Sequence, residues 1–230
     1  GHRLVNTLTQ RELNMTQNVL LFGGTGRTGN HIAKLLTARG DSVTAMARPQ
    51  SDTNQLETAG VIIFPGTPLS ADDVNNAFDS ASFSTVISTL GHRRGEPPPR
   101  ADLAGIDLII AAAKARGIQR MLMITMIGAG DSIEVVSEKV IQFLGEPIKA
   151  KTAAEDNLRN SGLDYTILRP GGLNEGPDTG TGIMVEECSM GVISTGDLAR
   201  LTLLSLDDDG TIGKTLHTIN PEIKEQAPLQ

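Results

Sequence analysis

Aromatic residues and cysteine are scarce in this sequence of 230 residues. It has no tryptophan, one tyrosine (Tyr165) and one cysteine (Cys188). A single cysteine cannot form an internal disulfide and excludes a cysteine zinc cluster, so a reducing, cytoplasmic setting is the simplest expectation. The four histidines, at positions 2, 31, 92 and 217, are too dispersed in sequence to suggest a metal site.

Long apolar runs and an excess of positive charge are also missing. No run approaches the ~20 apolar residues of a membrane helix, and no N-terminal stretch has the three regions of a signal peptide. The formal net charge of −7 argues against non-specific binding of nucleic acid. We therefore expect a small-molecule substrate as partner, with no nucleic acid and no membrane, and we leave a homo-oligomer open.

The segment 18–29, Asn-Val-Leu-Leu-Phe-Gly-Gly-Thr-Gly-Arg-Thr-Gly, organises the chain. Its apolar run 19–22 predicts a buried strand, and a helical pattern follows the glycines. Two spacings fit equally well: G-x-G-x-x-G at Gly24, Gly26 and Gly29, and G-x-x-G-x-x-G at Gly23, Gly26 and Gly29. Such glycines allow a tight turn, a close approach to a pyrophosphate and close packing of helix on strand. Because the helix N-terminus also offers free N–H groups, the segment predicts a dinucleotide site rather than an ordinary turn.

Strand and helix patterns alternate along the rest of the chain. The predicted strands are 19–22, 42–47, 61–64, 85–90, 120–125, 165–168 and 215–219, and the predicted helices are 27–39, 53–58, 71–79, 101–116, 149–161 and 197–206. Gly40 and Gly117 are placed as helix C-terminal glycines. This alternation predicts an α/β fold with a doubly wound parallel sheet. Residues 1–14 precede Met15 and are interpreted as a leader or a cloning remnant, so a single NAD(P)-binding domain is expected over 15–230.

Two loop-like stretches follow predicted strands. One is 91–99, with three consecutive prolines, and the other is the glycine-rich 171–182. Loops after the carboxyl ends of parallel strands border the ligand crevice of such a sheet. We therefore expect both loops to contact substrate, and we expect 171–182 to form a mobile flap over the pocket.

Three further motifs resemble those of the atypical short-chain dehydrogenase/reductases. They are Ala47-Arg-Pro49, Leu163-Asp-Tyr-Thr-Ile-Leu-Arg-Pro-Gly-Gly-Leu173 and Thr195-Gly-Asp-Leu-Ala-Arg200. More narrowly, the chain is similar to the NAD(P)H-binding, NmrA-like group that includes the flavin and biliverdin reductase B type. This resemblance extends from about Met15 to Asn220. It implies a Rossmann sheet with a short C-terminal portion that contributes to the substrate pocket.

The charges after the second predicted strand favour NADP(H) over NAD(H). An NAD site usually carries an acid about 20 residues after the glycines, whereas Arg48 stands there and Arg27 lies in the glycine loop. A guanidinium suits the 2′-phosphate of NADP because it offers two aligned donors. Alternatively both arginines are solvated surface residues, but their joint occurrence at these positions favours NADP.

The predicted cofactor contacts lie in five segments. They are Gly23, Gly24, Thr25, Gly26, Arg27, Thr28 and Gly29; Arg48; Thr67; Thr89, Leu90 and Gly91; and, by resemblance, Pro170, Gly171 and Leu173 at the nicotinamide.

The Tyr-x-x-x-Lys pair of ordinary short-chain dehydrogenases is absent. Lys151 matches the family's lysine, but Pro147 stands where the tyrosine would be. Lys151 either holds the nicotinamide ribose or is a solvated helix residue. Tyr165 is expected in the core. Thr125 is the available hydroxyl at the end of the fifth strand, unless the apolar Met126 takes that place, so Thr125 and Lys151 are the catalytic candidates.

Other polar residues have weaker claims. His92 and Arg93, after the fourth strand, are candidates for substrate binding, although a surface position is the default for His92. Asp131 and Glu155 are expected to be solvated acids.

Three functions remain open at this stage. The first is an NADPH-dependent oxidoreductase that reduces a small conjugated acceptor, flavin-, quinone- or polyketide-like, without a Tyr-x-x-x-Lys pair. The second is an NADP(H)-binding redox sensor without turnover, and the third is a non-redox isomerase or epimerase on the same fold. A hydrolase is disfavoured because no G-x-S-x-G motif is present.

Overall fold

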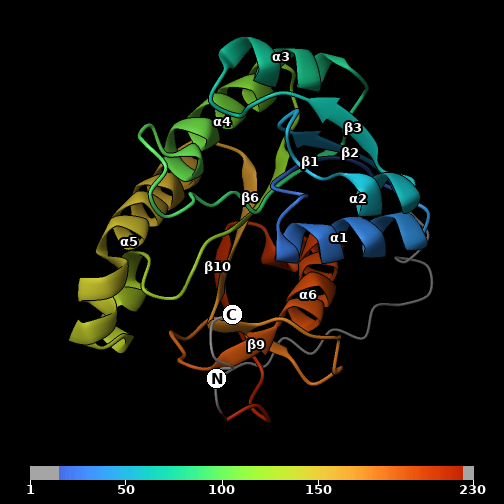
Figure 1. The fold of residues 1–230 in the computed structure, drawn as a ribbon. Helices are drawn as coiled ribbons and strands as arrows, with labels where there is room; N and C mark the ends of the chain where they lie inside the picture. Colours follow the sequence, from blue (N-terminus) through green and yellow to red (C-terminus); the bar gives the residue numbers. More distant parts are fainter. Residues whose placement is uncertain (1–15, 225–230) are drawn as a thin grey trace.

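The computed structural model describes residues 16–224 (Figure 1). The proposed leader, 1–14, lies outside the described residues. The strands are β1 Asn18–Phe22, β2 Ser42–Ala47, β3 Ile62–Pro65, β4 Thr85–Ser88, β5 Arg120–Ile124, β6 Asp164–Pro170, β7 Gly172–Asn174, β8 Ile183–Val185, β9 Val192–Ser194 and β10 Lys214–Ile219. The helices are α1 Arg27–Ala38, α2 Asn54–Thr58, α3 Ala71–Asp79, α4 Ile106–Ala115, α5 Glu138–Arg159 and α6 Thr195–Asp207. Short helical turns lie at η2 Ala101–Gly105, η3 Gly130–Val135 and η4 Asp209–Thr211.

The central sheet has the order β3-β2-β1-β4-β5-β6-β10-β8. Its first seven strands are parallel, and β8 joins β10 antiparallel at the edge. β7 and β9 form a separate two-stranded sheet. The predicted doubly wound parallel sheet is thus confirmed, with one correction: the edge strand β8 runs the other way.

Apolar side chains alternate between the two faces of the central strands and build two cores. Val19 and Leu21 of β1 pack with α1 and α6, whereas Leu20 and Phe22 pack with α3, α4 and α5. Figure 1 shows the sheet between these helix layers. Because both faces are covered, the central strands are continuous apolar runs, as in other parallel sheets.

Element boundaries agree closely where the sequence pattern is regular. The predicted strand 42–47 and helix 71–79 have the observed bounds. Gly40 and Gly117 follow helices with positive φ, as placed. The fourth strand was predicted to reach residue 90 but ends at Ser88; the N–H of Thr89 still donates to the carbonyl of Phe22 at 2.9 Å, and its hydroxyl donates to the carbonyl of Gly23 at 3.1 Å.

Helix α5 begins eleven residues before the predicted helix at 149. Its first half was missed because Leu144 has non-helical φ/ψ (−112°, 19°) and Pro147 interrupts the helical pattern. Proline lacks the N–H of a regular turn and disfavours helical geometry in the residue before it. The three-residue strands β7, β8 and β9 were also missed, because each is too short to show an alternating pattern.

The glycine-rich stretch 171–182 is tied to the body of the protein. Asp197, which is fully buried near the start of α6, accepts hydrogen bonds from the backbone N–H groups of Thr179 at 2.9 Å and Gly180 at 3.2 Å. The side chain of Asn220 donates to Asp197 at 3.0 Å and to Thr179 at 2.9 Å. These bonds weigh against the mobile flap that we expected.

Asp197 should therefore stabilise the fold in a pH-dependent way. Burial by itself raises the pKa of Asp197. Hydrogen bonds with Asp178, Thr179 and Asn220 lower the pKa by more than burial raises it, so the pKa lies below its usual range. A carboxylate with a depressed folded-state pKa contributes its full stability above about pH 4 and loses it progressively at lower pH.

Asp197→Asn should lower the free energy of unfolding at pH 7 by about 1.5–3 kcal/mol, because charged hydrogen bonds are replaced by neutral ones. Thermal denaturation should show the difference narrowing below about pH 4, and amide exchange at Thr179 and Gly180 should quicken in the variant. Asp72→Asn, an exposed acid in the first turn of α3, is the control. Equal melting temperatures of the Asp197→Asn variant and the parent at pH 7 would contradict this role.

Candidate cofactor and active site

The strand order reverses direction between β1 and β4, which lie side by side with Phe22 opposite Ser88. Ligands of open α/β sheets bind in the crevice at the carboxyl ends of the strands at such a switch point. Here the glycine loop follows β1 and Thr89 follows β4, and the hydroxyl of Thr89 joins the two by donating to the carbonyl of Gly23. The fold thus brings the predicted cofactor segments after β1 and β4 together.

The glycines of the loop have different tasks. Gly23 has φ of +90°, which favours glycine, and a Cβ there would lie 2.4 Å from Oγ1 of Thr89. A Cβ on Gly29 would lie 2.1 Å from the carbonyl oxygen of Gly23, so this glycine allows the helix to pack on the loop. Gly26 is exposed, and a Cβ there would approach only the oxygen of Gly23, at 3.3 Å.

The N-terminus of α1 is open toward the crevice. Gly26 is its N-cap, no side chain caps the helix, and the first turn contains no acid. The first N–H groups of a helix have no partner within the helix and carry the positive end of its dipole. The open glycine and uncapped helix together fit a pyrophosphate, and Gly23 to Gly29 would hold it.

The two predicted cations are each near one acid. Arg48 lies 3.3 Å from Glu96, and Arg27 lies 3.9 Å from Glu175 (Nη1 to carboxylate oxygen). Both arginines are more than one-third exposed, at 38% and 58% of the side chain. Surface pairs of this kind contribute only about 0–1 kcal/mol, so an incoming phosphate can compete with them.

The loop after β3 is held by an acid that the sequence analysis missed. The backbone N–H of Thr67 donates to the carboxylate of Asp73 at 2.9 Å, and the N–H of Asp73 itself donates to the hydroxyl of Ser70, the N-cap of α3, at 3.2 Å. The pattern Ser-x-x-Asp at 70–73 was the available signal for a helix start, although Asp73 bonds the N–H of Thr67 and not the N–H of Ser70 that a capping box would use. Asp73 therefore orders this loop and leaves the hydroxyl of Thr67 to bond the N–H of Leu69.

Lys151 is largely buried, with 12% of its side chain exposed. Its ammonium donates to the carbonyl of Leu90 and lies 3.7 Å from Asp102. Asp102, itself buried, accepts two hydrogen bonds from Arg100, at 3.0 and 2.8 Å. The alternative of a solvated lysine is thus wrong, and α5 is linked directly to the predicted cofactor residues after β4.

Burial lowers the pKa of Lys151, and nearby Asp102 opposes that shift. Asp102 was not singled out from the sequence. Its only signal is the Arg-x-Asp spacing that follows the proline-rich loop.

Thr125 lies at the carboxyl end of β5 and is buried. Its hydroxyl donates to Glu155 at 2.7 Å, and Glu155 is fully buried against Arg169 at 3.0 and 2.7 Å. The expectation of a solvated Glu155 is therefore wrong, because the face of α5 that carries it packs on β6. Asp131, by contrast, is 76% exposed as expected, although Arg169 binds it at 2.6 Å.

The substrate candidates lie on the loop after β4. His92 is half-buried and its Nε2 lies 3.0 Å from the carbonyl of Glu96, whereas Arg93 is exposed. Tyr165 lies at the other end of β6, half-buried, where its hydroxyl donates to Gly213 at 3.0 Å. It packs against the core at its ring but is not fully enclosed.

The segment after β6 passes close to other backbone. Pro170 is buried, and its carbonyl accepts from the N–H of Ile127 at 2.9 Å. A Cβ on Gly171 would lie 2.2 Å from the carbonyl oxygen of Gly191, and Leu173 packs on the core from β7. The predicted nicotinamide segment is thus held rigidly at the carboxyl edge of the sheet.

Neither a metal nor a membrane site emerges from the geometry. No cluster of three His, Cys, Asp or Glu residues within 16–224 is arranged to hold a metal ion. Among the helices of the same stretch, none is both long enough and apolar enough to cross a bilayer.

Comparison with known proteins identifies the family of the chain. A family model for NAD(P)H binding matches residues 23–209. The chain is 31% identical over 196 residues to a Bacillus subtilis protein named as an uncharacterized sugar epimerase, YhfK, covering 84% of this chain and 89% of that one.

Two solved structures are also similar. ChuY from Escherichia coli O157:H7, described as an anaerobilin reductase, is 30% identical with a TM-score of 0.81, over 90% of this chain and 99% of that one. A putative NAD-dependent epimerase/dehydratase from Bacillus halodurans is 28% identical with a TM-score of 0.77, over 89% and 94%. Fold and site together define an atypical short-chain dehydrogenase/reductase of the NmrA-like type. The chain belongs to the NAD(P)H-binding family, whose cofactor is a nicotinamide dinucleotide.

Gly26→Val should abolish cofactor binding and leave the melting temperature of the cofactor-free protein nearly unchanged. The valine side chain would enter the phosphate cradle, while the φ of −74° and ψ of 166° at this position suit any residue. Calorimetric titration and thermal denaturation test this. Gly29→Ala is the contrast, because its collision with Gly23 should lower the melting temperature itself. Normal dinucleotide binding by Gly26→Val would show that the loop does not hold the phosphates.

Proposed function

We propose that this protein is an NADPH-dependent reductase of a small conjugated acceptor. The observation that carries the proposal is the composition of the carboxyl edge of the sheet. An open phosphate cradle lies beside a buried Lys151 and a buried Thr125, while the only tyrosine of the chain is bound at Gly213. The site therefore suits a dinucleotide but lacks the tyrosine that ordinary short-chain dehydrogenases use as proton donor.

Each residue then has a defined task. The glycine loop and the N-terminus of α1 bind the pyrophosphate, and Lys151 fixes the loop after β4 through the carbonyl of Leu90. NADPH supplies the hydride when it is bound. Thr125 is a weak donor toward a substrate because its hydroxyl already donates a hydrogen bond to Glu155. A flavin-, quinone- or polyketide-like acceptor delocalises the incoming charge, so it needs less proton donation than an isolated ketone.

A similar protein supports reduction as the reaction class, since ChuY is described as a reductase. A second candidate, an epimerase, is favoured by the name of the Bacillus subtilis relative. An epimerase regenerates its cofactor in each turnover, whereas a reductase consumes NADPH stoichiometrically with its acceptor. A sensor binds NADPH and consumes none. Following NADPH absorbance against product formation separates the three.

NADPH should bind more tightly than NADH, because Arg48 and Arg27 suit the 2′-phosphate. Charged phosphate contacts contribute roughly 1.5–3 kcal/mol each before screening. Arg48→Glu should therefore lower the affinity for NADPH by at least about tenfold and leave the affinity for NADH nearly unchanged. Glu96→Gln removes the carboxylate that pairs with Arg48, so it should raise the affinity for NADPH by up to about fivefold. Calorimetry with both cofactors tests this, and equal affinities in the parent protein would refute the preference.

Flavin- and quinone-like acceptors should be reduced and simple aliphatic ketones should not. Thr125→Val should lower the rate only modestly, by less than about tenfold, because the acceptor rather than a protein acid takes up the charge. Steady-state assays on both substrate classes test this, with Thr44→Val, a buried threonine of β2, as control. Efficient reduction of a simple ketone together with a nearly inactive Thr125→Val would instead indicate a proton relay through this hydroxyl.

A further inference from the structure

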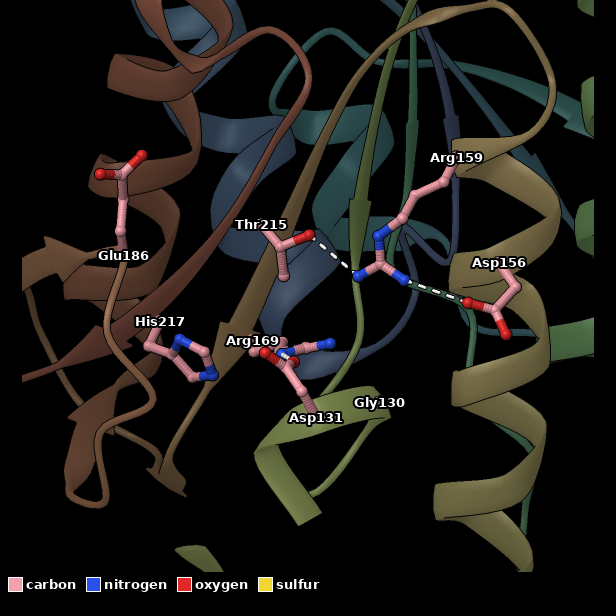
Figure 2. Close-up of a pocket in the computed structure, with 8 residues that line it drawn as sticks. All are labelled: Gly130, Asp131, Asp156, Arg159, Arg169, Glu186, Thr215 and His217. Atoms are coloured by element: carbon pink, nitrogen blue, oxygen red, sulfur yellow. Dashed lines mark hydrogen bonds and ion pairs between the residues drawn. The ribbon is translucent and has the colours of Figure 1, made fainter. Parts of the chain in front are cut away.

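A pocket of about 330 Å³ lies on the α5 side of the sheet (Figure 2). It is lined by Gly130, Asp131, Asp156, Arg159, Arg169, Glu186, Thr215 and His217. These residues come from η3, α5, β6, β10 and the turn after β8, and none of them belongs to the predicted cofactor segments. The volume falls within the range of small-ligand sites.

His217 lines the pocket and is 1% exposed. Neither ring nitrogen has a hydrogen-bond partner in the described part of the chain, although the backbone of Glu186 is close enough to favour protonation. Burial, reinforced by neighbouring Arg169, lowers the pKa of His217, so the ring is neutral at pH 7. A neutral imidazole offers one donor and one acceptor; the backbone of Glu186 can take up the donor, and the acceptor nitrogen has no partner in the described residues.

The ionised groups around the pocket are already paired. Arg169 binds Glu155 and Asp131. Arg159 binds Glu155 at 3.0 Å and Asp156 at 3.3 Å. Glu186 lies 3.0 Å from Lys214. The Arg169–Glu155 pair is buried on both sides, so a ligand that opened it would leave a buried charge without its partner, which is costly.

Donors and acceptors nevertheless remain on the same groups. Thr215 accepts a hydrogen bond from Arg159 at 3.0 Å and keeps its own O–H proton to donate. The carboxylates have further lone pairs, since each can accept about four hydrogen bonds. Figure 2 shows Thr215, His217, Arg159 and Arg169 gathered between β10 and α5, with Glu186 at the outer side of β10. A hydroxyl group, which donates and accepts at one atom, matches such a mixed array without disturbing the ion pairs.

We propose that this pocket binds a neutral polyhydroxylated compound of monosaccharide size through His217, Thr215 and the paired carboxylates. None of the lining residues belongs to the predicted cofactor segments, and the proposal does not depend on the proposed reductase activity.

The test uses the full chain labelled with ¹⁵N-histidine, titrated with D-glucose, D-ribose and myo-inositol. Acetate and methylammonium are the ionic probes. At least one polyol should shift the ring nitrogens of His217 and give a saturating calorimetric isotherm. Thr215→Val should weaken that polyol about 3- to 10-fold, the loss of one hydrogen bond.

Thr218→Val is the matched control, because Thr218 is buried on the opposite face of the same strand. It should leave the polyol affinity unchanged. The proposal is overturned if no polyol shifts His217, which would mean that the pocket holds water only. It is also overturned if the ionic probes bind instead, or if Thr218→Val weakens the polyol as much as Thr215→Val.

Discussion

The buried ion pair between Arg169 of β6 and Glu155 of α5 supports most of what surrounds the active edge. Two parallel hydrogen bonds join them, and both side chains are at most 1% exposed. Removing one partner of such a pair costs about 3–5 kcal/mol because the other charge stays buried. The pair fixes the register of α5 on the sheet. It thereby sets the position of Lys151, which lies one helical turn before Glu155, along the sheet, and Glu155 also accepts a hydrogen bond from the hydroxyl of Thr125.

The Rossmann order of the sheet was predictable because its signals are local. A buried strand in this fold is an apolar run, and the turn after β1 requires glycines that can be read directly. The structure explains those glycines individually, since a side chain at Gly23 would collide with Thr89 and one at Gly29 with the backbone of Gly23, whereas a Cβ at Gly26 would approach only the carbonyl oxygen of Gly23. The glycine loop was therefore predictable from the sequence, and its role in holding the phosphates stays a prediction.

The buried polar network was not predictable, because it depends on which face of a helix meets the sheet. Glu155 looks like any helical acid until α5 is docked, and Arg169 lies in a motif that indicates a family rather than a contact. Asp102 is similar, since its partner Lys151 is 49 positions away in sequence. Pro147 interrupts the helical pattern, so the first half of α5 was not predicted. The three-residue strands are too short for an alternating pattern to be detected. Long-range pairing of charges is a property of the packed fold.

The break in α5 divides the helix into two parts with different evolutionary freedom. The residues of α5 that are buried begin at Ile148, and Phe143 in the first half is 62% exposed. Substitutions before the break therefore change the surface beside the active edge at little cost in folding stability, whereas those after it disturb the ion pair and the core. The first half of α5 can therefore change in sequence while the residues that hold the buried ion pair and Lys151 stay the same. This separation is in keeping with relatives of similar fold that carry the names of both reductases and epimerases.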